Sequence, residues 1–489
     1  MTFQAEHPHT PVTASLKRQF KMTDAFTLAF VYISPIVALY AVFGLIVQAA
    51  GPAGWWVFPI GLCLQLLIAL SLGIMVSRWP LQGGSYQWAR RLLGNNCGWI
   101  TGWFYIWTLI FVFASNGYAI ASFLPAALGI DPFTTSTQIS IALLIICIAT
   151  ALNLMGPGAL KLLGKLSLGA EIIGSLGLAT VLLIWHRKHD LDILFTTAGA
   201  GGDSYLLGGL LMALGFIGFG LAGFESVCCM AEEIEEPEKN IPKAIIGALI
   251  AIGVVVSYCA LALILATPDF AAIVNGTIVD PAASTIQDAF GVNIARIFFV
   301  LVIIGFSASM MMAQTTVSRV IWAFSRDRIL PGATFLSKIS KRHGTPDRAI
   351  ALVGVLAMGV TLLAFSERVY ATLISSATAS FFITMGFAVV GLLFHLVSKQ
   401  WKSGKFSLGS MTLPVVIGAA CWVLFEIANS AWPREVAGQS WYVSWAVFIG
   451  LALIGISGAI VWMSIRNDVR TAGVLSESTE QLRPKELGV

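Results

Sequence analysis

The feature that most limits how this chain can fold is a series of apolar runs, each about 20 residues long, that recurs from Asp24 almost to the C-terminus. A helix of roughly 20 apolar residues is long enough to cross the hydrocarbon core of a bilayer. Only 11% of the residues are charged, against about a quarter in soluble domains. The mean hydropathy is +0.84. The chain therefore requires lipid as its solvent, and its composition leaves no room for a soluble domain.

The runs predict an all-α integral membrane protein with twelve transmembrane helices. The predicted spans cover residues 24–50, 55–76, 98–128, 137–154, 166–185, 205–230, 244–266, 292–318, 349–365, 370–397, 411–430 and 441–463. The polar segment before Asp24 has no apolar core and no small-residue cleavage site, so it is interpreted as a tail and not as a signal peptide.

The distribution of basic residues predicts the orientation, because Lys and Arg near helix ends are retained on the cytoplasmic side. With the N-terminus inside, 24 of the 29 Lys and Arg residues lie on cytoplasmic segments. The other five lie outside, at Arg187, Lys188, Arg296, Arg368 and Arg434. We expect a multi-pass protein of a bacterial-type inner (plasma) membrane with both termini in the cytoplasm.

Several other classes of protein are excluded by residue type and position. Six of the seven cysteines lie in apolar runs, where a thiol behaves as a small hydrophobic group, so no disulfide framework is expected. The six histidines lie in the tail, in loops or near helix ends, which predicts neither a metal site nor a membrane hydrolase with a Ser and His pair. The basic residues are scattered over short loops, so no nucleic-acid partner is expected. No cofactor is expected, and the protein is not expected to be an enzyme.

Two spans are interrupted at corresponding positions, which is typical of transporters built from inverted repeats. Span 1 contains Ser34-Pro35, and span 6 contains glycines at 215, 218, 220 and 223. Proline removes an intrahelical hydrogen bond and glycine weakens helical preference, so both segments can expose backbone groups to a ligand. The alternative is that these residues only help the helices to pack. The matched positions favour broken helices at a binding site.

Four stretches resemble the amino acid, polyamine and organocation permease superfamily. They are AAGPAGWW (49–56), RWPLQGGSYQWARRLLG (78–94), GFESVCCMAEEIEEPEKNIPKAI (223–245) and SRVIWAFSRDRILPG (318–332). The branch that contains amino acid, choline and 4-aminobutyrate permeases is the most similar.

The resemblance implies a LeuT-like five-plus-five inverted repeat with broken helices 1 and 6 and two further C-terminal helices. The expected parts are a cytoplasmic tail (1–23), a first repeat of spans 1 to 5 (24–185) and an inverted second repeat of spans 6 to 10 (205–397). Spans 11 and 12 (411–463) and a second cytoplasmic tail (464–489) follow. The outside loop after span 3 (128–137) has no cysteine, so a disulfide-linked subunit is not expected. A monomer and a homo-oligomer both remain open.

The resemblance also implies where substrate binds: at the breaks in spans 1 and 6, where free N–H groups face an anion and free C=O groups face a cation. Span 1 departs from the glycine-rich pattern of the family, since Pro35 has no N–H to offer a carboxylate. The predicted substrate-binding residues are Ser34, Pro35, Ile36, Val37, Ala38, Tyr105, Phe219, Gly220, Leu221, Ala222, Gly223 and Ser309.

Acidic residues within spans are further candidates, because a charge at mid-membrane costs roughly 2.5 to 3.5 kcal/mol. Glu171 takes a position in span 5 where many relatives have lysine. It could carry the coupling proton, ligate a cation or contact a substrate amine, or it could simply be hydrogen-bonded inside the bundle. Glu225, just past the break in span 6, is either a coupling group or an acceptor for the broken helix. Glu426 is assigned to packing or oligomer contacts. Glu232, Glu233 and the run to Glu238 are interpreted as a solvated loop face with a helix end, in preference to a gate.

Further polar residues are low-ranked candidates for the site. Those on span 8 either line the site, bind sodium or bond their own backbone; they are Ser307, Ser309, Gln314 and Thr315. Asn116 and Tyr118 on span 3 rank with them.

These observations predict a secondary active transporter of a small amine or amino acid that works by alternating access. Coupling to protons or exchange is favoured over coupling to sodium. A choline or polyamine type of organic cation transporter and a sodium-coupled symporter are the alternatives. A channel is disfavoured because the broken helices are paired and no pore loop is repeated.

Overall fold

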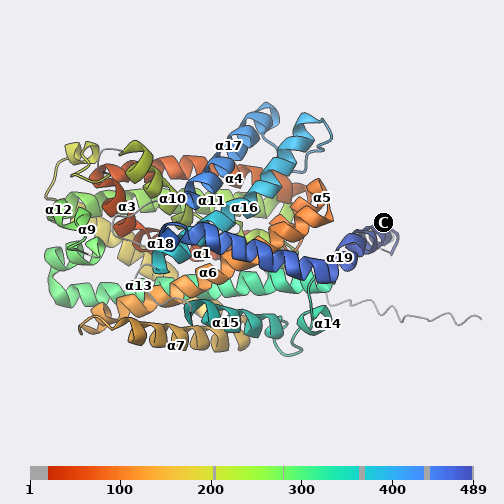
Figure 1. Ribbon diagram of the computed structural model, residues 1–489, viewed down its shortest axis with the longest axis horizontal. Coiled ribbons are helices and arrows are strands. Elements are labelled where there is room, and N and C mark those ends of the chain that lie inside the picture. Colours follow the sequence, from red (N-terminus) through yellow and green to blue (C-terminus); the bar gives the residue numbers. More distant parts are fainter. Residues whose placement is uncertain (1–19, 202–204, 279, 363–368, 434–440, 487–489) are drawn as a thin grey trace, which may run out of the picture.

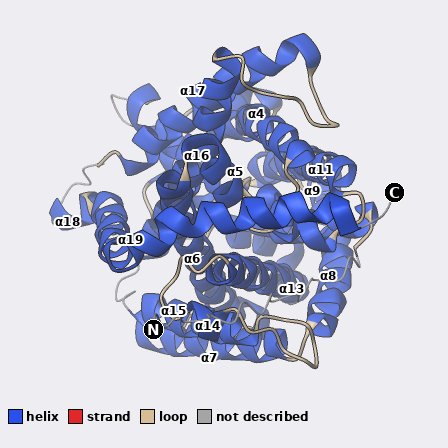
Figure 2. Cartoon of the chain, turned by 90° about the vertical axis from the view of Figure 1, so that its right-hand side faces the viewer, coloured by secondary structure: helices blue, strands red, loops and turns tan. Residues whose placement is uncertain are grey.

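The computed structural model describes residues 20–201, 205–278, 280–362, 369–433 and 441–486. Within these ranges the chain is helical and contains no β-strand beyond a single bridge between Phe20 and Ile234. The long helices run side by side along the long axis of the molecule (Figure 1). α7 and α15 form one flank, and α4 and α17 form the opposite flank in both views (Figures 1 and 2).

The first half of the chain supplies five membrane-length segments. In chain order its main helices are α1 (Met22–Ile33), α2 (Pro35–Tyr40), α3 (Phe43–Ala50), α4 (Val57–Arg78), α5 (Ser85–Leu93), α6 (Asn95–Leu128), α7 (Thr135–Leu154), α8 (Pro157–Glu171), the π-helical η2 (Ile172–Gly177) and α9 (Leu178–Trp185). Predicted span 1 is therefore broken twice, once at Ser34 as expected and once more at residues 41–42.

The second half repeats this pattern of one broken segment followed by long helices. Its main elements are the π-helical η5 (Leu206–Leu210), α10 (Leu211–Gly220), the 3₁₀-helical η6 (Phe224–Glu233), α11 (Pro237–Ala266), α12 (Phe270–Val274), α13 (Pro281–Arg326), α14 (Ala333–Leu336), α15 (Asp347–Leu362), α16 (Val369–Val397), α17 (Thr412–Ala431), α18 (Trp441–Ser444) and α19 (Ala446–Glu486).

Eleven segments of the described chain are long and apolar enough to cross a membrane. Eleven of the twelve predicted spans correspond to them. Predicted span 9 corresponds to α15, of which 16 residues are described, and its predicted end (363–365) lies outside the described residues. Several helices extend beyond the predicted boundaries, because polar and charged turns continue them into the interface. The longest, α13, has 46 residues and a kink at Gly291.

Capping residues close in the sequence determine where several helices begin and end. The side chain of Asp280 accepts a hydrogen bond from the Ala283 N–H at 2.9 Å and caps α13, and Pro281 occupies the first helical position, where no N–H donor is needed. Gly129 ends α6 in a left-handed conformation with φ +71°.

The centre of the bundle is formed by α6 and α13, which approach closely at Gly102. A Cβ atom at Gly102 would lie 2.0 Å from the ring of Phe324, so only glycine allows this contact. A buried polar cluster then fixes α7 to α13. Asn153 donates to Gln314 at 2.7 Å and accepts from Thr315 at 3.2 Å. Because such bonds are satisfied inside an apolar bundle, they hold these helices in one register.

Candidate functional site

The first part of the site is the break between α1 and α2. Ser34 joins the two helices with φ +52° and ψ +117°, a conformation that is unfavourable for any residue except glycine. The Ser34 hydroxyl accepts a hydrogen bond from the Val37 N–H at 3.1 Å and so caps α2. Pro35 occupies the first position of α2. The interruption predicted at Ser34-Pro35 is present.

Glu171, at the end of α8, reaches the same break. One carboxylate oxygen accepts a hydrogen bond from the Ser34 hydroxyl. The other accepts from the Ile36 N–H at 2.9 Å and from the Ser175 hydroxyl at 3.1 Å. This carboxylate therefore lies at the N-terminus of α2, where the partial positive charge of a helix favours an anion. The first amides of α2, which have no partner within the helix, are therefore hydrogen-bonded to side chains of the protein itself.

The second part of the site is the break between α10 and η6. The chain leaves the helix after Gly220, and Gly223 has φ +113°. A Cβ atom at Gly223 would also lie 2.4 Å from the ring of Tyr32, so both conformation and space require glycine here. Glu225 accepts hydrogen bonds from the Gly223 N–H at 2.9 Å and from the Tyr105 hydroxyl at 3.0 Å. Its carboxylate is thus fixed at the start of η6.

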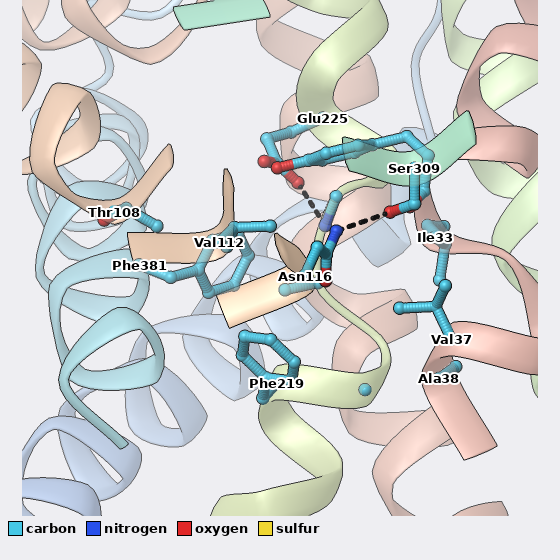
Figure 3. Close-up of a pocket in the computed structure, with 14 residues that line it drawn as sticks. Ile33, Val37, Ala38, Thr108, Val112, Asn116, Phe219, Glu225, Ser309 and Phe381 are labelled. Atoms are coloured by element: carbon cyan, nitrogen blue, oxygen red, sulfur yellow. Dashed lines mark hydrogen bonds between the residues drawn. The ribbon is translucent and has the colours of Figure 1, made fainter. Parts of the chain in front are cut away.

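The two breaks enclose a small cavity with a volume of about 30 Å³, which holds no more than a few water molecules. It is lined by residues of α1, α2, α6, α10, η6, α13 and α16, and by the break that follows α10. These residues are Tyr32, Ile33, Val37, Ala38, Thr108, Val112, Asn116, Phe219, Gly220, Ala222, Gly223, Glu225, Ser309 and Phe381. Figure 3 shows Glu225, Asn116 and Ser309 on one side of the cavity and Phe219 on the other.

The polar side of the cavity is ordered by hydrogen bonds. The Asn116 amide donates to the Ser309 hydroxyl at 3.2 Å (Figure 3). Ser309 in turn donates to the Tyr32 carbonyl at 2.7 Å. Thr108 donates to the carbonyl of Phe104 at 2.9 Å. Glu225 is therefore the charged group of a cavity whose other polar groups are neutral.

Most of the predicted site residues lie on this cavity. Those that line it are Val37, Ala38, Phe219, Gly220, Ala222, Gly223, Glu225 and Ser309. The others lie behind the wall. Ser34, Pro35 and Ile36 form the break itself, Leu221 is buried beside it, Tyr105 holds Glu225, and Glu171 lies behind α2.

Sequence reasoning missed several lining residues. The predicted site does not include five lining residues, and Asn116 is only a low-ranked candidate in it; the five are Tyr32, Ile33, Thr108, Val112 and Phe381. Tyr32 and Ile33 directly precede the Ser34-Pro35 signal, so the break itself could have indicated them. Thr108, Val112 and Asn116 share one face of α6, with spacings of four residues. Nothing in the sequence distinguishes Phe381 from the other phenylalanines of span 10.

Other polar candidates have structural partners. On α13, Ser307 donates to the carbonyl of Ile303 at 2.7 Å, as membrane hydroxyls often do. Gln314 and Thr315 bond to Asn153 instead of lining the cavity. Glu426 is fully buried and accepts from Asn429 at 3.1 Å, and Asn429 also donates to the Leu211 carbonyl of α10 at 2.9 Å. Glu426 therefore serves packing between α17 and α10, which is one of the two roles predicted for it.

The expectation that Glu232 and Glu233 form a solvated face is wrong. The Glu233 side chain is 3% exposed and pairs with Arg319 at 2.7 Å. Glu232 pairs with Arg326 at 3.3 Å and is partly buried. The cause is tertiary: the charged end of α13 lies directly over the end of η6.

These pairs belong to a larger network at the same end of the bundle. Asp327 accepts from Tyr86 at 2.8 Å and from Arg90 at 3.1 Å, which ties α5 to α13. Phe20 hydrogen-bonds to the backbone of Glu233 at 3.1 Å, which adds the segment before α1. The network links the segment before α1, the end of η6, α5 and the end of α13 at this end of the bundle.

A bundle that is apolar outside and broken at its centre around a polar cavity has the form of a membrane transporter. Comparison with known families shows which kind. The model of the family described as "Amino acid permease" matches residues 24–454, so the chain belongs to the amino acid permeases. It is a multi-pass secondary transporter of the amino acid, polyamine and organocation superfamily, whose members are transporters and not enzymes.

Curated relatives are similar over most of their length. The branched-chain amino acid permease BcaP of Bacillus subtilis is 26% identical over 459 residues, which cover 90% of this chain and 92% of the relative. The GABA-specific permease of Saccharomyces cerevisiae is 28% identical over 459 residues, covering 86% and 77%. The amino-acid permease BAT1 of Arabidopsis thaliana is 24% identical over 453 residues, covering 84% of each chain.

Proposed function

We propose that this permease takes up a small amine or an amino acid whose carboxylate is distant from the nitrogen, such as a substrate of the 4-aminobutyrate type. An organic cation of the choline or polyamine type, in which the carboxylate is absent, also belongs to this class. The close alternative is an ordinary α-amino acid. Two features together carry the proposal. Glu225 lies in the cavity wall, and the amides of α2 that could bind a carboxylate are already bonded to Glu171 and Ser34.

The electrostatics of the cavity favour a cation. An α-carboxylate entering here meets Glu225, and the Ile36 and Val37 amides that would neutralise it have protein partners. An ammonium group gains a charge-assisted hydrogen bond to Glu225, worth about 1.5–3 kcal/mol. Aromatic faces of Phe219 and Phe381 line the same space, and a cation over such a ring gains roughly 0.5–2 kcal/mol. When the carboxylate of the substrate lies several bonds from its nitrogen, the carboxylate can stay away from Glu225 while the ammonium group binds there.

The mechanism that fits these features is alternating access. We infer a five-plus-five inverted repeat of residues 24–185 and 205–397, followed by two helices at 411–463, with both termini in the cytoplasm of a plasma membrane. The paired breaks in α1–α2 and α10–η6 support this division. So does the distribution of Lys and Arg, since the network of Arg319, Arg326 and Arg90 lies at the end that the charge count assigns to the cytoplasm. The cavity has a volume of about 30 Å³ and must widen before it can hold a substrate.

Coupling is assigned to protons, with Glu171 and Glu225 as the two carboxylates that can carry them. Glu171 bonds the break in span 1 and Glu225 bonds the break in span 6. A change of charge at either group thus alters the bonds that hold a broken helix. Sodium is the alternative coupling ion, with Ser309 as the span 8 hydroxyl that lines the cavity.

The test is competition in proteoliposomes between 4-aminobutyrate, a matched amine and the matched α-amino acid, first with a proton gradient and then with a sodium gradient. We expect the amine and 4-aminobutyrate to compete best and the proton gradient to drive uptake. Effective competition by the α-amino acid alone would refute the substrate class, and uptake driven by sodium alone would refute the coupling.

A variant with its own control links the result to the site. Glu225→Gln should weaken amine binding roughly 10- to 150-fold, which corresponds to one charge-assisted hydrogen bond. Glu426→Gln removes a buried carboxylate that lies outside the cavity and should leave amine binding unchanged. Equal effects of the two substitutions would mean that Glu225 acts only through stability.

A further inference from the structure

A second cavity lies on the outside of the bundle between α6 and α19, far larger than the central one. Its volume is about 330 Å³. α19 packs against α6 in the end-on view (Figure 2). Trp103 of α6 donates to the carbonyl of Ile454 at 3.0 Å, while Asn96 and Trp462 line the same cavity. The two helices run in opposite directions (Figure 1), so Asn96 at the start of α6 and Trp462 in the later part of α19 lie toward the same end of the groove.

The walls of this groove are rigid and apolar. Trp99 and Trp103 stack at 5.3 Å with an angle of 13° between their rings. Both indole N–H groups already donate to backbone carbonyls, of Ile329 at 3.0 Å and of Ile454 at 3.0 Å. The aromatic wall therefore offers an occupant surface without hydrogen-bond donors, which suits a hydrocarbon chain.

Small residues on α19 form the opposite wall and leave the space open. Gly455, Gly458 and Ala459 line the groove. A Cβ atom at Gly458 would lie 2.8 Å from the Trp103 ring, so glycine is needed for the contact between the helices. At Gly455 a Cβ atom would meet nothing within 4 Å, so that position borders empty space.

The polar end of the groove carries a positive charge. Trp462 lines the groove, and Arg466 follows four residues later, on the same face of α19. Arg466 is exposed. Trp and Arg are the residues that mark the boundary between hydrocarbon and headgroups in membrane proteins. A negative headgroup at Arg466 thus continues directly into an apolar chain in the groove.

We propose that this groove binds one anionic phospholipid, with an acyl chain between α6 and α19 and its phosphate at Arg466. The surroundings fit lipid as the occupant, since only 11% of the membrane-crossing part of α19 is buried against the rest of the chain. A basic residue beside a groove between transmembrane helices is a recurring site for acidic headgroups. This proposal is independent of the transported substrate.

The test is native mass spectrometry of the purified, delipidated full-length protein with equal amounts of phosphatidylglycerol and phosphatidylcholine. The wild type should retain one phospholipid and prefer phosphatidylglycerol about five-fold, the effect of about one basic residue near a headgroup. Arg466→Gln should bring that ratio close to one. Lys165→Gln, which removes an exposed basic residue from α8, should leave it unchanged.

A second pair of variants tests the groove itself. Gly455→Leu fills the empty space and should abolish the single lipid adduct for both lipids. Gly359→Leu introduces the same side chain at an exposed glycine of α15 that also has no neighbour within 4 Å, and it should not affect the adduct. The proposal is overturned by equal binding of the two lipids to wild type, or by an adduct that survives Gly455→Leu. A dimer without lipid that Gly455→Leu dissociates would overturn it as well, by assigning the groove to a second copy.

Discussion

Glu171→Gln separates a role in coupling from a role in stability. The carboxylate of Glu171 accepts three hydrogen bonds, from Ser34, Ile36 and Ser175. A glutamine of the same shape can keep its carbonyl toward Ile36 and Ser175, while its amide faces the Ser34 hydroxyl, which can accept in turn. All three contacts can therefore survive as neutral hydrogen bonds.

The expected change in the free energy of unfolding is small. A charged hydrogen bond contributes about 1.5–3 kcal/mol and a neutral one about 0.5–1.5 kcal/mol, so the three contacts lose about 3–4.5 kcal/mol. Removing a charge from mid-membrane returns about 2.5–3.5 kcal/mol on insertion scales. These two terms nearly cancel. Glu171→Leu has no such compensation, because it leaves the Ile36 N–H without an acceptor at a cost of about 1–3 kcal/mol.

The assay compares concentrative uptake with counterflow in proteoliposomes. Counterflow exchanges labelled for unlabelled substrate and needs no gradient of the coupling ion. We expect Glu171→Gln to abolish concentrative uptake and its dependence on pH, while counterflow and the thermal stability of the purified protein are retained. Uptake and pH dependence equal to wild type would refute the reasoning and leave Glu171 as a structural cap of α2.

Three further results are expected. Ser34→Gly should be more stable than Ser34→Ala by about 1 kcal/mol in thermal unfolding, because both lose the hydroxyl but only glycine accepts φ +52° without strain; equal stabilities would mean that the break is not strained. Glu233→Gln leaves a buried arginine without its ion pair, so it should open the network and increase maleimide labelling of the buried Cys229 several-fold, as measured by mass spectrometry. Labelling at the wild-type rate would argue against a gate at this end. Reporters fused after Lys402 should read cytoplasmic and those at Ala200 should read periplasmic, and the opposite result at either site would overturn the topology.

The membrane class, the positions of the spans and both breaks could be predicted because each depends on local chemistry. Apolar length identifies a span whatever its neighbours are. Pro35 and Gly223 mark their breaks because one lacks an N–H and the other has φ +113° in the folded chain. The second break at residues 41–42 has neither proline nor glycine, and no sequence signal indicated it.

What each side chain faces was decided only by the tertiary structure. Glu171 meets Ser34, 137 positions earlier in the chain, and Glu233 meets Arg319, 86 positions later. No local pattern predicts such pairs, because helix propensity and hydropathy carry no information on which helices become neighbours. The sequence thus indicated that carboxylates lie within the membrane. Only the packing of α8 against α1 and of η2 against α2 turned one of them toward the amides of span 1. Only the packing of α13 over η6 buried another that by sequence alone belonged to a solvated loop.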